Sequence, residues 1–338
     1  TLQVISLLLT EQQEQKAGIR EERCSLIVCP ASLVYNWQKE VERFAPSLST
    51  VMILGSATER EDIIKKAKPG QILITSYDLL KRDVDVYKDK IFAVQVIDEA
   101  QYIKNAGTQA AKGVKKITAG FKLALTGTPI ENRLSELWSI FDYLMPGFLY
   151  GYDVFKKELE SPIVKNQDAD AMTRLQRMVA PFILRRLKTD VLKDLPDKLE
   201  ENRYVRFEAE QQKLYDAQLL HMQTTIKAQG QEEFNKNKLQ ILSELTKLRQ
   251  ICCDPGLCYD NFKGSSAKLE ACVDLIENAK DGGHKILLFS QFTSMLEKIG
   301  ERLTKNGISY YVITGSTPKE KRLQLVKEFN KDDTTVFL

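Results

Sequence analysis

The sequence has few of the residues from which metal centres and disulfide frameworks are built. It contains two histidines and six cysteines in 338 residues, and none of the cysteines forms a Cys-x2-Cys pair matched by a second pair. A zinc site around Cys252, Cys253 and Cys258 would lack an obvious fourth ligand. Free thiols in a reducing compartment are therefore the simpler interpretation.

Long apolar runs and a strong excess of one charge are also missing. No apolar stretch approaches the ~20 residues that a membrane-spanning helix needs. The net charge of +3 does not by itself indicate nucleic-acid binding. Any contact with DNA would have to use local clusters of positive charge and backbone amides. The apolar content of 43% is ordinary for a globular protein.

One stretch of the chain combines an apolar run with charge. Residues 91–97 are almost continuously apolar and are followed directly by Asp98 and Glu99. Such a run suits a strand buried on both faces of a parallel sheet, and ligands of such sheets bind beyond the carboxyl ends of the strands. In a nucleoside-triphosphate site, the first carboxylate can hold Mg²⁺ and the second can orient or deprotonate water. Taken alone, the pair is more simply a solvated turn.

The first half of the chain alternates between strand and helix patterns, as expected for a doubly wound parallel sheet. The capping-box spacing at residues 58–61 predicts a helix start, and another helix is predicted over 108–117. The predicted strands cover residues 24–29, 50–54, 71–75, 91–97 and 121–125.

The second half begins with helical patterns and returns to alternation. Residues 134–195 and 208–252 are mostly helical, with a short strand predicted at 204–207. From residue 266 onwards, strands are predicted at 285–290 and 310–313, with helices between them. The fold class is therefore α/β, with two alternating lobes separated by a helical insertion.

Several short motifs resemble those of the Swi/Snf-type (Snf-two) DNA-dependent ATPases of helicase-like superfamily two. The resemblance covers nearly all of the chain, and the motifs occur in the family's order. They are motif Ia at Pro30–Glu40, motif Ib at Ile74–Tyr77, the Walker B box at Asp98–Gln101, motif III at Leu125–Asn132 and motif IV at Leu287–Phe292. Two blocks resemble landmarks of the family's helical protrusions, at Leu184–Arg186 and Leu248–Cys252.

The resemblance implies two RecA-like lobes, which are parallel sheets flanked by helices, with helical protrusions between them. Lobe 1 is expected at residues 1–148 and its protrusion and linker at 149–200. The protrusion of lobe 2 is expected at 201–265 and lobe 2 itself at 266–338. The Walker B box together with Trp138–Phe148 looks closest to the bacterial members.

The resemblance also implies a site for ATP and Mg²⁺. Asp98 and Glu99 would be the catalytic pair. The residues implied to bind the nucleotide are Thr1, Asp98, Glu99 and Gln101, of which Thr1 and Asp98 would contact Mg²⁺. Those implied to couple the phosphate state to lobe closure are Thr126, Gly127 and Thr128.

Both ends of the chain look cut from something longer. Thr1 resembles the tail of the Walker A loop, whose glycines and lysine are absent, and Val336–Leu338 resembles the strand that enters motif V. Motifs V and VI, the latter supplying arginines to the phosphates in this family, are also absent. We therefore expect the 338 residues by themselves not to turn over ATP.

A further group of residues is implied to contact the DNA backbone, which carries no base information. They are Pro30, Ser32, Trp37, Ser76, Tyr77, Lys104, Asn105, Arg185, Arg186, Gln291, Phe292, Thr293, Gly315 and Ser316. Ordinary structural roles compete with this one. Ser32, Ser76 and Tyr77 could be helix caps or turn residues, Trp37 a core residue, and the two arginines structural ion-pair partners.

The function implied is ATP-driven movement along double-stranded DNA, with a DNA-bound protein as a further candidate partner and no role for a membrane. The location would be the nucleoid of a bacterial cell or the nucleus of a eukaryotic one. Two alternatives stay open. An RNA-directed helicase of the same superfamily is disfavoured by the helical insertion with its Leu-Arg-Arg block. A non-catalytic scaffold for nucleic acid is disfavoured by the intact Asp98-Glu99 pair.

Overall fold

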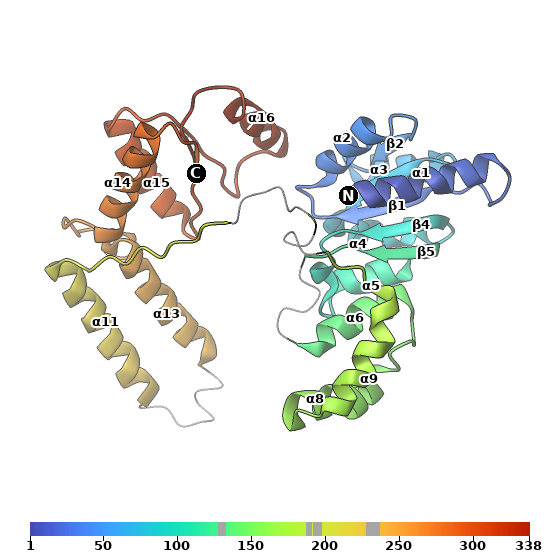
Figure 1. Cartoon of the computed structure of the whole chain (residues 1–338), viewed down its shortest axis with the longest axis horizontal. Helices are drawn as coiled ribbons and strands as arrows, with labels where there is room; N and C mark the ends of the chain where they lie inside the picture. Colours follow the sequence, from blue (N-terminus) through green and yellow to red (C-terminus); the bar gives the residue numbers. More distant parts are fainter. Residues whose placement is uncertain (128–132, 187–190, 192–197, 228–236) are drawn as a thin grey trace. The chain divides into compact units, whose positions relative to one another are not determined.

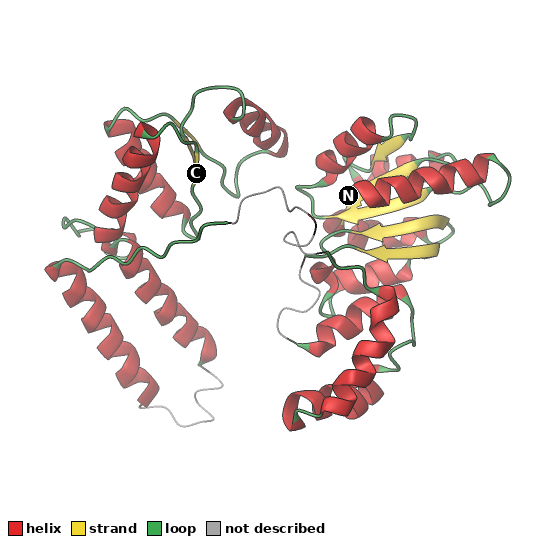
Figure 2. Cartoon of the chain, viewed as in Figure 1, coloured by secondary structure: helices red, strands yellow, loops and turns green. Residues whose placement is uncertain are grey.

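A computed structural model describes residues 1–127, 133–186, 191, 198–227 and 237–338. The chain divides into two compact units, residues 1–194 and residues 195–338. Each unit contains a parallel sheet flanked by helices, as the sequence predicted (Figures 1 and 2). Among the described helices, none is long and apolar enough to cross a membrane.

The sheet of the first unit has five parallel strands in the order β2-β3-β1-β4-β5. The strands are β1 (Ser25–Cys29), β2 (Thr50–Met52), β3 (Ile72–Ser76), β4 (Ile91–Ile97) and β5 (Thr118–Ala124). Because every neighbouring pair is parallel, the carboxyl ends of all five strands lie at one edge of the sheet. The segment that follows each strand therefore begins at this edge.

Helices cover both faces of this sheet, and the side chains of β1 show how. Leu26 and Val28 join one apolar cluster, whereas Ile27 and Cys29 join the cluster on the other face. Successive side chains of a strand point to opposite faces, so a strand buried on both faces reads as a continuous apolar run. The two-sided burial inferred from the sequence is thus confirmed.

One face is covered by two helices and the other by four. The first two are α1 (Leu2–Lys16) and α2 (Val34–Phe44). The other four are α3 (Ala57–Lys66), α4 (Tyr77–Asp83), α5 (Gln109–Lys116) and α6 (Leu134–Leu144). A separate apolar cluster joins α6 to the helices after it, which are α7 (Tyr152–Phe155), α8 (Ser161–Asn166) and α9 (Ala169–Val179).

The second unit has a smaller parallel sheet in the order β6-β8-β7. Its strands are β6 (Ile286–Leu287), β7 (Tyr310–Tyr311) and β8 (Val336–Phe337). The helices packed against them are α14 (Ala267–Asp281) and α15 (Thr293–Lys305), and α16 (Lys319–Phe329) precedes β8. Two longer helices, α11 (Ala209–Lys227) and α13 (Lys238–Cys253), lie side by side (Figure 1).

Two local predictions were wrong. Residues 201–208 form no strand, and Tyr204 is 92% exposed, because no strand among the described residues pairs with their backbone groups. The capping box lies at Ser56 and Glu59 instead of residues 58–61. The Ser56 hydroxyl accepts from the Glu59 amide at 3.3 Å, and the Glu59 carboxylate accepts from the Ser56 amide at 2.7 Å.

A buried ion pair ties α3 to the end of α4. The Arg60 guanidinium donates two hydrogen bonds of 2.6 Å to the two carboxylate oxygens of Asp83 and a third, of 2.7 Å, to the Gly55 carbonyl. The side chains of Arg60 and Asp83 are only 7% and 8% exposed. Removing one partner of such a pair leaves the other charge buried without compensation.

We expect Arg60→Met to lower the free energy of unfolding of the first unit by about 3–5 kcal/mol. Urea denaturation followed by tryptophan fluorescence measures this, since Trp37 and Trp138 both belong to that unit. Lys65→Met is the matched control, because Lys65 pairs with Glu61 on the exposed face of the same helix. Its effect should stay within about 0.5 kcal/mol. Equal effects of the two substitutions would contradict a buried, structurally required pair.

Candidate functional site

Asp98 and Glu99 lie directly after β4, at the carboxyl edge of the five-stranded sheet. The Asp98 amide donates to the Val28 carbonyl of the neighbouring strand β1 at 2.8 Å, so the parallel ladder continues one residue beyond β4. Ile97, the last residue of the strand, is fully buried, whereas Asp98 and Glu99 are half-buried. The apolar run therefore anchors the strand, and the two carboxylates lie where the core ends.

Three further hydrogen bonds hold Asp98 in place. Its Oδ2 atom accepts from the indole Nε1–H of Trp37 at 2.9 Å, and its Oδ1 atom accepts from the Glu99 amide at 2.9 Å. The hydroxyl of Tyr77 donates to the Asp98 carbonyl at 2.7 Å. Burial raises the pKa of Tyr77 well above its ordinary value, and the nearby Asp98 charge raises it further, so the hydroxyl keeps its proton.

Glu99 adopts a left-handed backbone conformation, with φ 52° and ψ 56°. Within the described part of the chain, only Tyr150 and Gln167 share a positive φ among residues other than glycine. This conformation brings a side chain's Cβ close to the following carbonyl and costs energy. It turns the chain so that the Ala100 amide donates to the Leu125 carbonyl at 2.8 Å, which joins the segments after β4 and β5.

A chain of side-chain hydrogen bonds connects Glu99 to the segment after β5. The amide nitrogen Nε2 of Gln101 donates to Oε2 of Glu99 at 2.6 Å, and the Thr126 hydroxyl donates to Oε1 of Gln101 at 2.9 Å. Gln101 uses both ends of its amide group, one as donor and one as acceptor. The residues of the Walker B-like and motif III-like segments therefore form one connected polar network.

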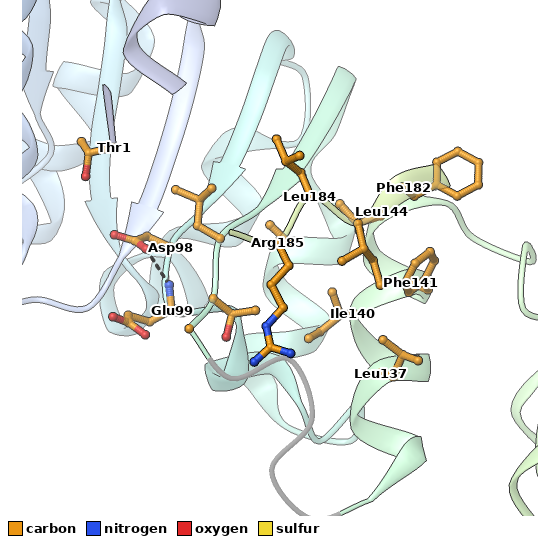
Figure 3. A pocket seen from close by; sticks show the side chains of 15 residues that line it. Thr1, Asp98, Glu99, Leu137, Ile140, Phe141, Leu144, Phe182, Leu184 and Arg185 are labelled. Carbon is orange, nitrogen blue, oxygen red and sulfur yellow. Dashed lines mark hydrogen bonds between the residues drawn. The ribbon is translucent and has the colours of Figure 1, made fainter. Parts of the chain in front are cut away.

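Glu99 and Thr126, the two ends of this network, border one cavity of about 370 Å³ (Figure 3). Thr1, Asp98, Glu99, Thr126 and Gly127 form its polar side. The apolar side comes from α6 and from residues 182–184, and Arg185 also lines it. The remaining lining residues are Ala124, Leu125, Leu137, Ile140, Phe141, Leu144, Phe182, Ile183 and Leu184. Thr1, the Asp98-Glu99 pair and Gly127 thus meet at one cavity although these three positions are far apart in the sequence.

Thr128, the third residue implied in coupling, lies outside the described residues. Gln101 does not line the cavity itself and reaches it only through Glu99 and Thr126.

Two of the implied DNA contacts in the first unit are wrong as side-chain contacts. Trp37 is 1% exposed and packs in the core with α1 and β1, so its ring offers no face on which a partner could stack. Tyr77 is 3% exposed, and its hydroxyl is bonded to the Asp98 carbonyl. The polar atoms of both side chains are bonded to Asp98, the Trp37 indole to its carboxylate and the Tyr77 hydroxyl to its backbone carbonyl.

The other implied contacts after β1 and β3 divide by exposure. Ser32 is exposed just before α2, whereas Pro30 is buried. Ser76 is 3% exposed and accepts from the Leu79 amide at 3.3 Å, so it caps α4 as the alternative interpretation expected. Of Pro30, Ser32 and Ser76, only Ser32 therefore presents an exposed side chain.

The remaining residues of this group in the first unit take several positions. Lys104 and Asn105 follow the short helix Ala100–Ile103, and Asn105 is exposed with its Oδ1 accepting from the Gly107 amide at 3.0 Å. Arg186 donates to Oε1 of Gln3 in α1 at 2.8 Å, a hydrogen bond to a neutral side chain, and its contact with DNA stays a prediction.

In the second unit, the implied residues follow β6 and β7. Gln291 and Thr293 are exposed and Phe292 is half-buried, while Gly315 and Ser316 lie in an exposed turn. Because β6 and β7 are both parallel to β8, these two groups lie at the same edge of their sheet. This repeats the arrangement of the first unit.

Two arginines that the sequence assigned no role hold these segments. Arg249 on α13 donates to Oε1 of Gln291 and lies 6.0 Å from the ring centre of Phe292. Arg322 on α16 donates to the carbonyls of Thr314 and Gly315. Arg249 belongs to the block at residues 248–252 that resembles the family, which was the available signal. Nothing in the sequence pointed to Arg322.

A parallel α/β sheet with an Asp-Glu pair and a bonded Thr-Gly segment at its carboxyl edge is the arrangement of a nucleotide-binding motor domain. Comparison with known families agrees. Residues 1–257 match the SNF2-related domain, and residues 267–338 match the helicase conserved C-terminal domain. The chain therefore belongs to the SNF2-related family, and its two units have the RecA-like architecture of that family's ATPase core.

Relatives come from bacteria, eukaryotes and archaea. An uncharacterized ATP-dependent helicase of Mycoplasma genitalium is 38% identical over 98% of the chain, and the chain spans 31% of that protein. The TATA-binding protein-associated factor MOT1 of Saccharomyces cerevisiae is 31% identical over 98% of the chain, which spans 21% of MOT1. The chain thus covers about a third of these relatives or less.

One solved structure with the same fold is the Sulfolobus solfataricus SWI2/SNF2 ATPase core in complex with double-stranded DNA. It is 34% identical with a TM-score of 0.50, and the match covers 96% of this chain and 69% of that one.

The left-handed conformation of Glu99 generates a prediction about stability. We expect Glu99→Gly to be more stable than Glu99→Ala by about 1 kcal/mol, because glycine has no Cβ to strain in this conformation. Urea denaturation of both variants measures the difference. At Lys65 inside α3, the same pair of substitutions should show the opposite order by about 1 kcal/mol. Equal stability of the two Glu99 variants would contradict a strained backbone.

Proposed function

We propose that this chain is the motor part of an ATP-driven translocase that acts on double-stranded DNA. The observation that carries the proposal is the convergence of Thr1, Asp98, Glu99 and Thr126 on one cavity at the carboxyl edge of the sheet. In parallel α/β sheets this edge is where ligands bind. Because the chain belongs to the SNF2-related family, we expect it to use ATP. The cavity contains hydroxyl and carboxylate side chains that suit the binding of a nucleotide with its cation.

The residues at the cavity fit Mg²⁺ bound together with a nucleotide. Mg²⁺ prefers oxygen ligands, keeps several waters, and is usually held by one or two carboxylates plus substrate phosphates. Thr1 offers a hydroxyl and Asp98 a carboxylate at this cavity. The described residues contain no group of three or more His, Cys, Asp or Glu side chains that could hold a metal ion. When bound, the ion would neutralise charge that develops on the phosphates.

Glu99 is suited to orient water or accept its proton. A carboxylate has about four acceptor positions, so the hydrogen bond from Gln101 leaves room for a water molecule. The same bond fixes the direction of the side chain. Through Gln101, the state of Glu99 is connected to Thr126 in the segment after β5. We propose that this network, together with Gly127 and Thr128, relays the phosphate state to closure of the lobes.

Contact with DNA would use the edges where strands end and helices begin. The N-cap position of α2 is Leu33, whose side chain cannot accept a hydrogen bond, so the first amides of this helix have no side-chain cap there. Helix N-termini of this kind bind phosphates. Exposed Ser32 precedes it, and the turn at Gly315–Ser316 offers a similar edge in the second unit. Such contacts carry no base information, so binding would be independent of sequence.

If the chain acts on duplex DNA, its location in the cell and a further protein partner follow from that. We propose that the protein acts where DNA is, in the nucleoid of a bacterial cell or the nucleus of a eukaryotic one. A protein already bound to the DNA would be displaced or moved as the motor advances. The relative MOT1 is described as associated with TATA-binding protein, a name that supports a partner of this kind.

The first test is ATP turnover by the chain extended at both ends, so that the phosphate-binding loop and motif VI are present. It is measured without nucleic acid and with duplex DNA, single-stranded DNA or RNA. Stimulation by duplex DNA is the expected result. Stimulation by RNA alone would favour an RNA-directed helicase, and no turnover under any condition would favour a scaffold.

In the same extended chain, Glu99→Gln should lower turnover by about 100-fold or more, because the amide cannot accept the proton of water. Binding of nucleotide and DNA should remain. Glu61→Gln, which removes a carboxylate from the exposed face of α3, is the control and should leave turnover unchanged. Wild-type turnover in Glu99→Gln would refute the assignment of Glu99.

The DNA-binding edge can be tested with the 338-residue chain itself. Ser32→Glu should weaken binding of a fluorescent duplex by about 5-fold, since a like charge near a phosphate costs ~1 kcal/mol in water. The effect should shrink as salt rises. Ser47→Glu is the matched control, because Ser47 is also exposed but lies before β2, at the opposite edge of the sheet. Equal weakening by both variants would argue against an edge-specific contact.

A further inference from the structure

Trp37 makes a contact that neither a core tryptophan nor a DNA-contacting residue requires. Its ring is buried between α1, α2 and the sheet, with 1% of its surface exposed. Its one polar atom, Nε1, donates to Oδ2 of Asp98 at 2.9 Å across 61 residues of sequence. A tryptophan that only filled space could have met a backbone carbonyl instead, as Trp138 does with Tyr150 at 3.1 Å.

The hydrogen bond acts on the orientation of the carboxylate. Oδ1 of Asp98 accepts from the Glu99 amide and Oδ2 accepts from the indole, so each oxygen is held by one donor. Each oxygen keeps a further acceptor position for a cation or a water. Because the indole is packed on all sides it cannot follow a rotation of the carboxylate, and the plane of the carboxylate is fixed by it.

The backbone of Asp98 is held by the neighbouring elements as well. Its amide donates to Val28 on β1 at 2.8 Å, and its carbonyl accepts from the Tyr77 hydroxyl at 2.7 Å. The ring of Tyr77 is stacked on Tyr102, with centroids 5.0 Å apart and an interplanar angle of 5°. Main chain and side chain of Asp98 are therefore positioned from α2, from β1 and from the start of α4.

We propose that Trp37 is a positioning residue for Asp98. It would touch neither nucleotide nor DNA, and would set the direction in which the Asp98 carboxylate meets a divalent cation. Hydrogen bonds to metal-ligating carboxylates orient them, and loss of such a bond typically lowers metal affinity or activity by 10- to 100-fold. The inference rests on the proposed function in one respect, namely that Asp98 ligates a divalent cation.

The same residue connects the cation site to the segment proposed to contact DNA. Trp37 lies on the first turn of α2, and exposed Ser32 lies just before that helix. The Trp37 amide donates to the Leu33 carbonyl at 2.9 Å, so the helical ladder begins at Leu33 and includes Trp37. A displacement of the start of α2 on binding DNA would therefore reach the Asp98 carboxylate through one rigid side chain.

The first experiment uses the indole N–H signals of the 338-residue chain, labelled with ¹⁵N. The sequence contains two tryptophans, so two signals are expected, and Trp138→Phe assigns them. Mn²⁺ is added as a paramagnetic probe. We expect the Trp37 signal to broaden at a lower Mn²⁺ concentration than the Trp138 signal. In Asp98→Asn, which removes the negative charge and leaves one acceptor oxygen, this preference should vanish. Equal broadening of both signals, or a preference that survives Asp98→Asn, would overturn the proposal.

The second experiment measures Mn²⁺ affinity directly, by electron paramagnetic resonance of the free ion. Trp37→Phe keeps most of the ring volume and removes the donor, and we expect about 10-fold weaker binding. Trp138→Phe is the matched control and should bind Mn²⁺ like the wild type. Lower stability of Trp37→Phe with unchanged affinity in the folded chain would mean a purely structural role. If Trp37→Phe does not fold, the indole signals of the unaltered Trp37 still decide the question.

Duplex DNA binding by the same chain separates failure of this inference from failure of the proposed function. If the chain binds DNA but Mn²⁺ does not broaden the Trp37 signal preferentially, only the positioning role of Trp37 would be overturned. Absence of both DNA binding and any Mn²⁺ effect that depends on Asp98 would overturn the proposed function together with the inference.

Discussion

The parallel register of the five-stranded sheet is the constraint on which the site depends. The order β2-β3-β1-β4-β5 places the carboxyl ends of all strands at one edge, because each neighbouring pair runs in the same direction. The segments beginning at Pro30, Tyr77, Asp98 and Leu125 therefore share that edge. Reversing one strand would move its segment to the far side of the sheet, and no side-chain bond between these segments could form.

Within this edge, buried side chains do more than fill space. Trp37 and Tyr77 both belong to clusters that cover the sheet, yet each directs its one polar atom at Asp98. Gln101 and Thr126 extend the network to Glu99. Because these side chains are fixed by packing or by hydrogen bonds, they restrict the movement of the two carboxylates. Glu99 itself is held in a left-handed conformation, a strain that is typical of functional sites.

Much of the fold and part of the site could be predicted from the sequence. Apolar runs such as residues 91–97 identify buried strands directly, and motifs that resemble the family place Asp98 and Glu99 at the end of one. The short strand expected at 204–207 failed because a strand needs a partner, which local composition does not reveal. The capping box failed by two residues, since two overlapping spacings, Ser56–Glu59 and Thr58–Glu61, satisfy the same pattern.

The sequence by itself determined the order of the motifs and the two-sided burial of the strands, and it placed two adjacent carboxylates directly after one of those strands. Only the tertiary structure decided what the aromatic and basic residues around them do. Trp37 contacts Asp98 instead of DNA, Arg185 lines the cavity, and Arg186 bonds to Gln3. The physical reason is that these contacts join residues from 61 to 183 positions apart. Such pairs are set by strand order and helix packing, which leave no periodic trace in the local sequence.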